Sequence, residues 1–229
     1  MENHVNVVWE IPYFDIPITN VVVMSWIAMI VIILWALIAT RKMKLVPTGL
    51  QNTAEIVVET ITNFTASFLG ERGKSFAPYV GSVALFLAIA NTLGALFMST
   101  LSDGLIAPPT RDFAIPVALA GMTIIIVVAA GIYYKGLKGF IKRLFSPIPF
   151  LFPFNLLEFI TKPLSLSMRL FGNILGAYIL MELLFANLPW AVPSIACLYF
   201  DLFDGLLQTF IFVLLTVLYI SEEVKEEEE

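Results

Sequence analysis

The chain has 229 residues, of which 59% are hydrophobic and only 14% charged, and its mean hydropathy is +0.90. A soluble domain rarely shows this balance, so the composition predicts a polytopic membrane protein. The net charge of −5 comes largely from the terminal run EEVKEEEE, which is expected to be a solvated tail, and the near-neutral remainder does not suggest a nucleic-acid partner. Cys197 and His4 are the only residues of their kinds, which excludes a disulfide framework and a multi-histidine metal site.

The whole chain is expected to form a single membrane domain, residues 1–229, that begins with an outer tail, residues 1–17. The tail lacks the basic residues of a signal peptide, so residues 18–40 are predicted to be an uncleaved membrane-spanning helix. Residues 48–69 have one apolar and one polar face, as in a helix that lies on the membrane surface. This stretch is short of basic residues, which favours packing on protein over binding to lipid headgroups.

Two further spans are predicted, residues 78–101 and residues 113–134, and a short loop joins them. Small residues and Asn91 share one side of the first of these spans. The asparagine could form a helix–helix hydrogen bond or belong to a polar pathway. The second span ends in the basic run KGLKGFIKR, and several prolines stiffen the connector that follows.

The last two helices, residues 154–187 and residues 193–220, are expected to form a hairpin followed by an acidic tail, residues 221–229. At 1.5 Å per residue the first is about 50 Å long, whereas the hydrocarbon core is about 30 Å thick. It must therefore tilt steeply or break, and we favour a steep tilt, because both helices could then run as an inclined pair along a curved neighbour. The predicted fold is an all-α membrane protein with five membrane-crossing helices and one interfacial amphipathic helix.

Basic residues predict the orientation of the chain in the membrane. With this topology, nearly all lysines and arginines of the loops fall on one side, and only Arg111 falls on the other. The N-terminus is therefore expected outside and the C-terminus in the cytoplasm.

Arg169, near the middle of the long helix, is the residue that most needs an explanation. A fixed charge at mid-membrane costs about 2.5–3.5 kcal/mol even on the lenient insertion scale, so it normally faces a wet cavity or a partner. The residues on its side of the helix are polar or small, which lets another surface approach closely. They are Glu158, Lys162, Ser165, Gly172, Asn173 and Gly176. An arginine that snorkels to the interface or holds a helix pair together is the simpler alternative.

The last helix carries a second polar stripe. It contains Asp201, Asp204, Gly205, Gln208, Phe212 and Tyr219. Carboxylates in an apolar helix shift toward neutrality or find partners. The two stripes therefore predict a polar seam, interpreted either as an arginine–aspartate pair that holds a hairpin together or as a proton or ion path. The glycines and the additional polar groups favour the ion path.

Four motifs connect these features to a known family. The run KPLSLSMRLFGN, followed by a helix that ends in QTFIFVLLTVLYIS, closely resembles the a subunit of rotary F-type ATP synthases. The runs RKMKLVPTGLQN and ANTLG also resemble that family, and the resemblance covers nearly the whole chain. It implies a non-catalytic subunit of a bacterial inner membrane that lies against a rotating ring of c subunits and is held by peripheral-stalk b subunits. Two offset half-channels would lead to the ring carboxylates.

The resemblance also implies roles for single residues. Arg169 matches the family's essential arginine, which attracts the ionised ring carboxylate and blocks leakage between the half-channels. Gln208 matches a glutamine that faces this arginine, and Asn173 matches the asparagine one turn beyond it. Glu158 matches a polar position near the cytoplasmic exit, and Asn91 matches the asparagine of the outer half-channel. The residues of the strip expected to face the ring are Ser165, Gly172 and Gly176.

The chain departs from the family pattern at two positions. Many members have a glutamate nine residues after the arginine, where this chain has Tyr178. Some members have a histidine seven residues before the glutamine, where this chain has Asp201. Asp201, or Glu182 one turn past Tyr178, could replace the missing glutamate on the outer path.

Two rival functions fit less well. A stand-alone secondary ion transporter should show an inverted repeat and broken helices, and neither is visible in the sequence. A purely structural membrane protein would not need Arg169 on a strip of small residues. No nucleophile–base set, phosphate loop or metal cluster is apparent, so no cofactor is expected and ATP chemistry would belong to other subunits. The transported ion is expected to be H⁺, the commoner case, with Na⁺ as the alternative.

Overall fold

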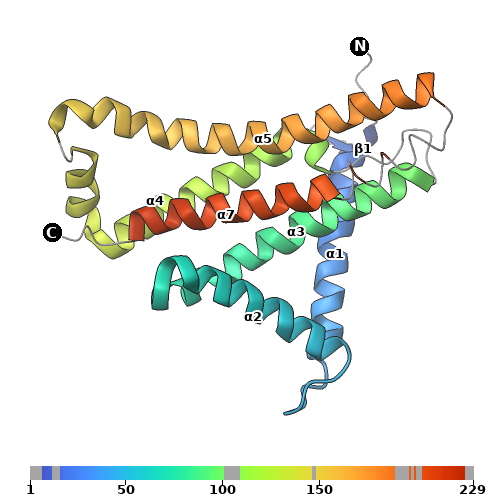
Figure 1. Ribbon diagram of the computed structural model, residues 1–229, viewed down its shortest axis with the longest axis horizontal. Helices are drawn as coiled ribbons and strands as arrows, with labels where there is room; N and C mark the ends of the chain where they lie inside the picture. The colour runs from blue at the N-terminus through green and yellow to red at the C-terminus, as the bar shows by residue number, and fades with distance from the viewer. Residues whose placement is uncertain are drawn as a thin grey trace.

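The computed structural model describes residues 7–11, 16–100, 109–145, 148–188, 196, 199 and 203–224. The chain is almost entirely helical over these ranges (Figure 1). Five helical stretches within them are long and apolar enough to cross a membrane. They are Asn20–Thr40, Leu50–Leu93, Ala114–Leu144, Pro149–Leu184 and Asp204–Val224. The prediction of an all-α membrane protein is thus confirmed.

A small β-hairpin precedes the first membrane helix. Strand β1 (Val7–Ile11) pairs antiparallel with strand β2 (Ile16–Thr19), with Ile11 opposite Ile16. The sequence interpretation of residues 1–17 as a tail missed this hairpin, although both strands are rich in β-branched residues. Helix α1 (Asn20–Thr40) follows β2 directly and is buried mainly on the side that carries Ala28, whereas most of its large apolar side chains are exposed, as expected of a helix that meets lipid.

Helix α2 (Leu50–Leu69) is the amphipathic segment, and its apolar side packs on protein. A short 3₁₀ turn, η1 (Gly70–Arg72), leads from it into helix α3 (Gly73–Thr100). Side chains such as Phe64 and Phe68 pack against a core shared by α3, α4 and α7. The helix α3 begins five residues before the predicted span, because Pro78 lies inside its first turns instead of starting it. A proline near a helix start removes one backbone hydrogen bond without ending the helix.

Helix α4 (Ala114–Leu144) follows the 3₁₀ turn η2 (Pro109–Arg111) and changes direction within its length. Gly136 has φ +68° and ψ +162°, a combination that only glycine adopts readily. The predicted span of residues 113–134 therefore corresponds to the part of α4 before this break. Beyond Gly136, a short helical piece turns toward the start of α5 (Figure 1).

Helix α5 (Phe152–Asn187) starts after the 3₁₀ turn η3 (Pro149–Leu151) and is continuous through Pro163. Its 36 residues make it about 54 Å long. Helix α7 (Asp204–Val224) runs antiparallel beside it, and both run across the direction of α1 (Figure 1). The helix α5 is thus unbroken, and its steep tilt in the membrane stays a prediction. Residues 189–192 of the predicted link and most of residues 193–203 lie outside the described residues.

The last turn of α7 is held by four earlier parts of the chain. Glu223 is buried and pairs with Arg143 of α4, and Glu222 pairs with Lys162 of α5. In addition, the Arg72 guanidinium of η1 donates a hydrogen bond to the Val224 carbonyl oxygen at 2.7 Å, and the Ser221 hydroxyl donates one to the Phe68 carbonyl oxygen of α2 at 3.2 Å. We call residues 221–224 with these partners the α7 terminal cluster. The sequence interpretation of residues 221–229 as a solvated tail does not describe residues 221–224, because cations from three elements surround them. Residues 225–229 lie outside the described residues.

Candidate functional site

Arg169 lies on the outer surface of α5. Its side chain is exposed, whereas its neighbours Leu166 and Leu170, on the adjoining side of the helix, are fully buried against the rest of the chain. Within the part of the chain that the structure describes, Arg169 forms no ion pair. The fold therefore presents a permanent cation on the exposed face of a helix that is long and apolar enough to cross a membrane.

The small residues around Arg169 form an open strip. Ser165, Gly172 and Gly176 are exposed on α5, and Asn173 beside them is half-buried. A Cβ atom added to Gly172 or Gly176 would meet no heavy atom within 4 Å. Packing inside the chain thus does not require glycine at either position, and the space in front of them is free for another surface.

One end of this strip joins α5 to α7 through charged side chains. The Nζ atom of Lys162 lies 3.1 Å from a carboxylate oxygen of Glu158 and 2.5 Å from one of Glu222. The same ammonium group lies 5.3 Å from the ring centroid of Tyr219. Glu158, the predicted exit residue, is therefore part of an ion-paired group that ties the helix of Arg169 to α7.

A second polar group, which we call the Asn91 cluster, is buried between α3, η2 and α7. The Asn91 Nδ2 atom donates hydrogen bonds to the Gly205 carbonyl oxygen at 3.1 Å and to the Thr209 hydroxyl at 3.3 Å. Its Oδ1 atom accepts one from the Thr110 hydroxyl at 2.8 Å. A Cβ on Gly205 would lie 3.1 Å from the Asn91 Cβ, so the two helices approach closely here. The helix–helix hydrogen bond considered for Asn91 is thus present, and its place in an ion path stays a prediction.

Gln208 lies on α7 next to the Asn91 cluster and is only 3% exposed. In the described part of the chain no hydrogen bond joins it to Arg169, which points outward. Measured from the Lys162–Glu222 pair, Arg169 is about 10 Å along α5, whereas Gln208 is about 21 Å along α7. The chain alone therefore divides the predicted seam into an exposed Arg169 strip and a buried Asn91 cluster.

Two of the remaining candidate residues, Asp204 and Glu182, lie toward the same end of the molecule as the Asn91 cluster. Asp204 is partly buried at the start of α7. Glu182 is exposed on α5. Asp201 lies outside the described residues, as does the side chain of Tyr178, whose backbone belongs to α5. Among the described residues, no three His, Cys, Asp or Glu side chains are grouped so that they could hold a metal ion.

Several residues of these clusters have no local sequence signal. Thr110 follows a proline pair in a loop, and Thr209 is one of many hydroxyl residues in apolar helices. Glu223 stands in a run of glutamates, and its partner Arg143 stands in a run of basic residues. Their pairing becomes visible only once the helices are placed together.

Comparison with known proteins gives a consistent result. The family model described as "ATP synthase A chain" matches residues 22–221. The protein named ATP synthase subunit a of Moorella thermoacetica is 37% identical over 209 residues, which cover 91% of this chain and 92% of the relative. The chloroplastic ATP synthase subunit a of Stigeoclonium helveticum is 38% identical over 222 residues, which cover 95% of this chain and 89% of the relative.

Proposed function

The chain belongs to the ATP synthase A chain family, and from this premise we propose that Arg169 is the fixed charge that couples ion flow to rotation of a ring of c subunits. The chain is a multi-pass membrane protein of the ion-translocating sector. It supplies a stationary surface for the ring and carries out no ATP chemistry itself.

The observation that carries this proposal is that Arg169 is exposed on α5 beside Gly172 and Gly176, where an added Cβ would meet open space, and has no ion pair among the described residues. An unpaired cation in lipid is costly, so a carboxylate from another chain is the natural occupant of the space in front of it. In a medium of low dielectric constant, a permanent cation favours the charged form of a nearby carboxylate. A ring carboxylate that reaches Arg169 would therefore release its ion. It would have to be neutralised again before it could move into lipid.

The release would have a direction if one ion path opened to the outside and a second one opened to the cytoplasm. We assign the exit path to the end of α5 that carries Glu158 and Lys162, where charged side chains are partly exposed. We assign the outer path to the other end, where the buried Asn91 cluster adjoins Gln208 and Asp204. Further members of the proposed ion pathway are Asn173, Tyr178, Glu182 and Asp201. Because Arg169 lies between the two ends along α5, an ion would have to cross on the ring.

The proposal implies an orientation and a set of partners. The N-terminus lies outside and the C-terminus lies in the cytoplasm, in keeping with the basic residues of the loops. The ring of c subunits covers the Arg169 strip, peripheral-stalk b subunits hold the chain in place, and lipid covers the remaining apolar surface. The transported ion is H⁺, with Na⁺ as the alternative. A stand-alone transporter would be expected to use broken helices around a midplane pocket, whereas α5 is continuous.

The test is ATP synthesis by the whole complex in liposomes, driven by a pH gradient or by a sodium gradient applied alone. Arg169→Ala should abolish synthesis under either gradient, and the complex should still contain this chain and the c ring. The gradient that works in the parent complex identifies the ion. Ion-driven synthesis at the parent rate in the alanine variant would refute the role of Arg169.

A further inference from the structure

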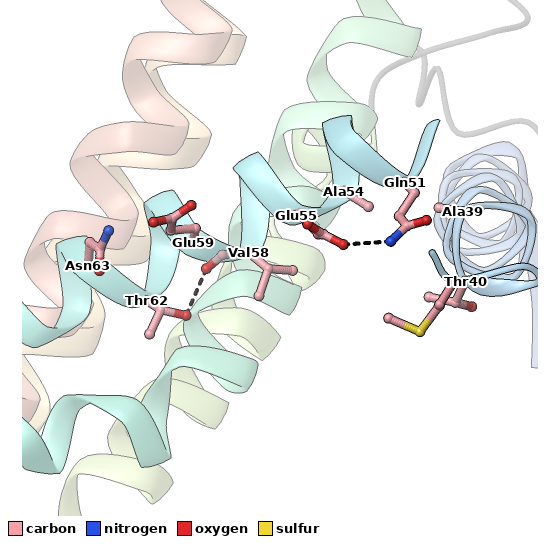
Figure 2. A pocket seen from close by; sticks show the side chains of 10 residues that line it. Ala39, Thr40, Gln51, Ala54, Glu55, Val58, Glu59, Thr62 and Asn63 are labelled. Carbon is pink, nitrogen blue, oxygen red and sulfur yellow. Dashed lines mark hydrogen bonds between the residues drawn. The ribbon is translucent and has the colours of Figure 1, made fainter. Parts of the chain in front are cut away.

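A groove lies between the C-terminal end of α1 and the polar side of α2 (Figure 2). Its volume is about 440 Å³, and its wall is mostly apolar. Ala39 and Met43 line it from the α1 side, and Ala54 and Val58 line it from α2. An apolar groove that is open along one side has the form needed to hold an extended hydrocarbon chain.

A second, basic cleft of about 250 Å³ adjoins this groove, since both are lined by Ala39 and Gln51. Arg41, Lys42 and Lys44 line the cleft, and all three side chains are exposed. The two hollows together place three positive charges at the mouth of an apolar groove.

The connection between α1 and α2 is held in shape by Gln51, which is 8% exposed. Its side-chain amide accepts a hydrogen bond from the Lys44 backbone N–H at 2.9 Å and donates one to the Lys44 carbonyl oxygen at 2.8 Å. It also donates to the Glu55 carboxylate at 2.8 Å (Figure 2). Gly49 has φ +60°, a backbone conformation that favours glycine. The motif RKMKLVPTGLQN therefore builds a hydrogen-bonded corner that holds the backbone of the basic segment beside the start of α2.

The surroundings of this corner suit the boundary between hydrocarbon and headgroups. The last turns of α1 before the groove carry exposed apolar side chains, among them Leu34 and Leu37. In the corner itself, exposed Met43, Leu45 and Val46 alternate with the basic residues. Apolar side chains mixed with lysine and arginine are typical of segments that insert into the interface of an anionic membrane.

We propose that the α1–α2 corner is a binding site for one phospholipid with an anionic headgroup. The phosphate lies in the cleft of Arg41, Lys42 and Lys44, and an acyl chain lies in the groove beside Ala54 and Val58. Glu55 and Glu59 lie on the α2 side of the groove and repel a headgroup placed there, which directs the phosphate to the basic cleft. The site does not depend on the role of Arg169, because it lies on other helices.

The test uses the whole complex in detergent with a photoactivatable phosphatidylglycerol, and labelling is measured on the peptide that contains residues 38–63. The variant Arg41→Gln/Lys42→Gln should reduce this labelling at least about fivefold, because each basic residue near the surface contributes to lipid attraction. The variant Lys138→Gln/Lys142→Gln removes the same charge from exposed positions on α4 and should leave the labelling unchanged. For the groove, Ala54→Trp should block the acyl chain, whereas Thr60→Trp on another side of α2 should not.

Four results would overturn the proposal. Labelling that survives both Arg41→Gln/Lys42→Gln and Ala54→Trp would show that neither hollow holds the lipid. An equal loss of labelling in the variant Lys138→Gln/Lys142→Gln would indicate that the general surface charge, and not a site, attracts the lipid. Competition by inorganic phosphate at millimolar concentration would indicate a site for a soluble anion. Equal labelling by a phosphatidylcholine probe would remove the preference for an anionic headgroup.

Discussion

Two arginines on neighbouring helices show how this chain treats charge in two different ways. Arg143 of α4 pairs with Glu223, a carboxylate of α7 that is only 2% exposed. Arg169 of α5 is exposed and forms no ion pair among the described residues. A buried carboxylate and a cation on an apolar helix are each costly alone. The chain thus contains the partner of the arginine that holds its fold together, whereas Arg169 has no such partner among the described residues, and under the proposed function its partner is a carboxylate of the ring.

The largest effect is expected from breaking the internal pair. Arg143→Ala leaves the buried Glu223 carboxylate without its cation, which should cost about 3–5 kcal/mol of stability. The measurement is the midpoint of thermal unfolding of the detergent-solubilised complex. The double variant Arg143→Met/Glu223→Leu should recover most of this loss, because an apolar pair replaces the ion pair. A single variant as stable as the parent would show that the pair is not structural.

A smaller but more specific effect is expected when Arg169 receives an internal partner and so comes to resemble Arg143. Gly172→Asp places a carboxylate three residues from Arg169, on the same side of α5, where a side chain meets open space. Competition with the external carboxylate should lower ion-driven ATP synthesis at least about tenfold. Gly172→Asn has nearly the same size without the charge and should retain more activity. Equal rates in the two variants would mean that the charge at this position is irrelevant.

The Asn91 cluster provides an intermediate case, because its polar groups are satisfied inside the chain. Asn91→Leu leaves the Thr110 hydroxyl and the Gly205 carbonyl oxygen without this partner, at a cost of about 1–3 kcal/mol. A lower unfolding midpoint with a normal rate of ATP synthesis would assign Asn91 to helix packing alone. A synthesis rate that falls more steeply at low outer proton concentration would assign it to the outer path.

The smallest effect is expected at the exposed side of the α7 terminal cluster. Glu222 is about half exposed, so Glu222→Gln should cost no more than about 1 kcal/mol. The effect should shrink further at high salt. A change in the unfolding midpoint as large as that of Arg143→Ala would show that Glu222, and not Glu223, provides most of the stability of this cluster.

The sequence predicts those features that have a local signal. Arg169 stands out because a charge interrupts an apolar helix, and the spans are visible as apolar runs between basic or proline-rich segments. The predicted span in α4 ends at residue 134 because the basic run starts at Lys135, and the break at Gly136 lies two residues beyond that predicted end. The α7 terminal cluster has no such signal, since the hydrogen-bonding partners of its residues lie 60 to 153 positions earlier in the chain. The register of α7 against α5 depends on the same distant contacts, so no local pattern shows that Gln208 is buried while Arg169 is exposed.

The α7 terminal cluster also has a consequence for how the protein is made. Residues 221–224 leave the ribosome after every element that they join, because Phe68, Arg72, Arg143 and Lys162 all precede them. Until α7 has been inserted, Arg143 lacks its buried carboxylate and the core side of α3 and α4 lacks its cover. The earlier helices can therefore enter the bilayer one by one, but their final arrangement is fixed only in the last step of synthesis. A chain that stops before residue 221 would leave a membrane intermediate with exposed cations, which cellular quality control could distinguish from the finished protein.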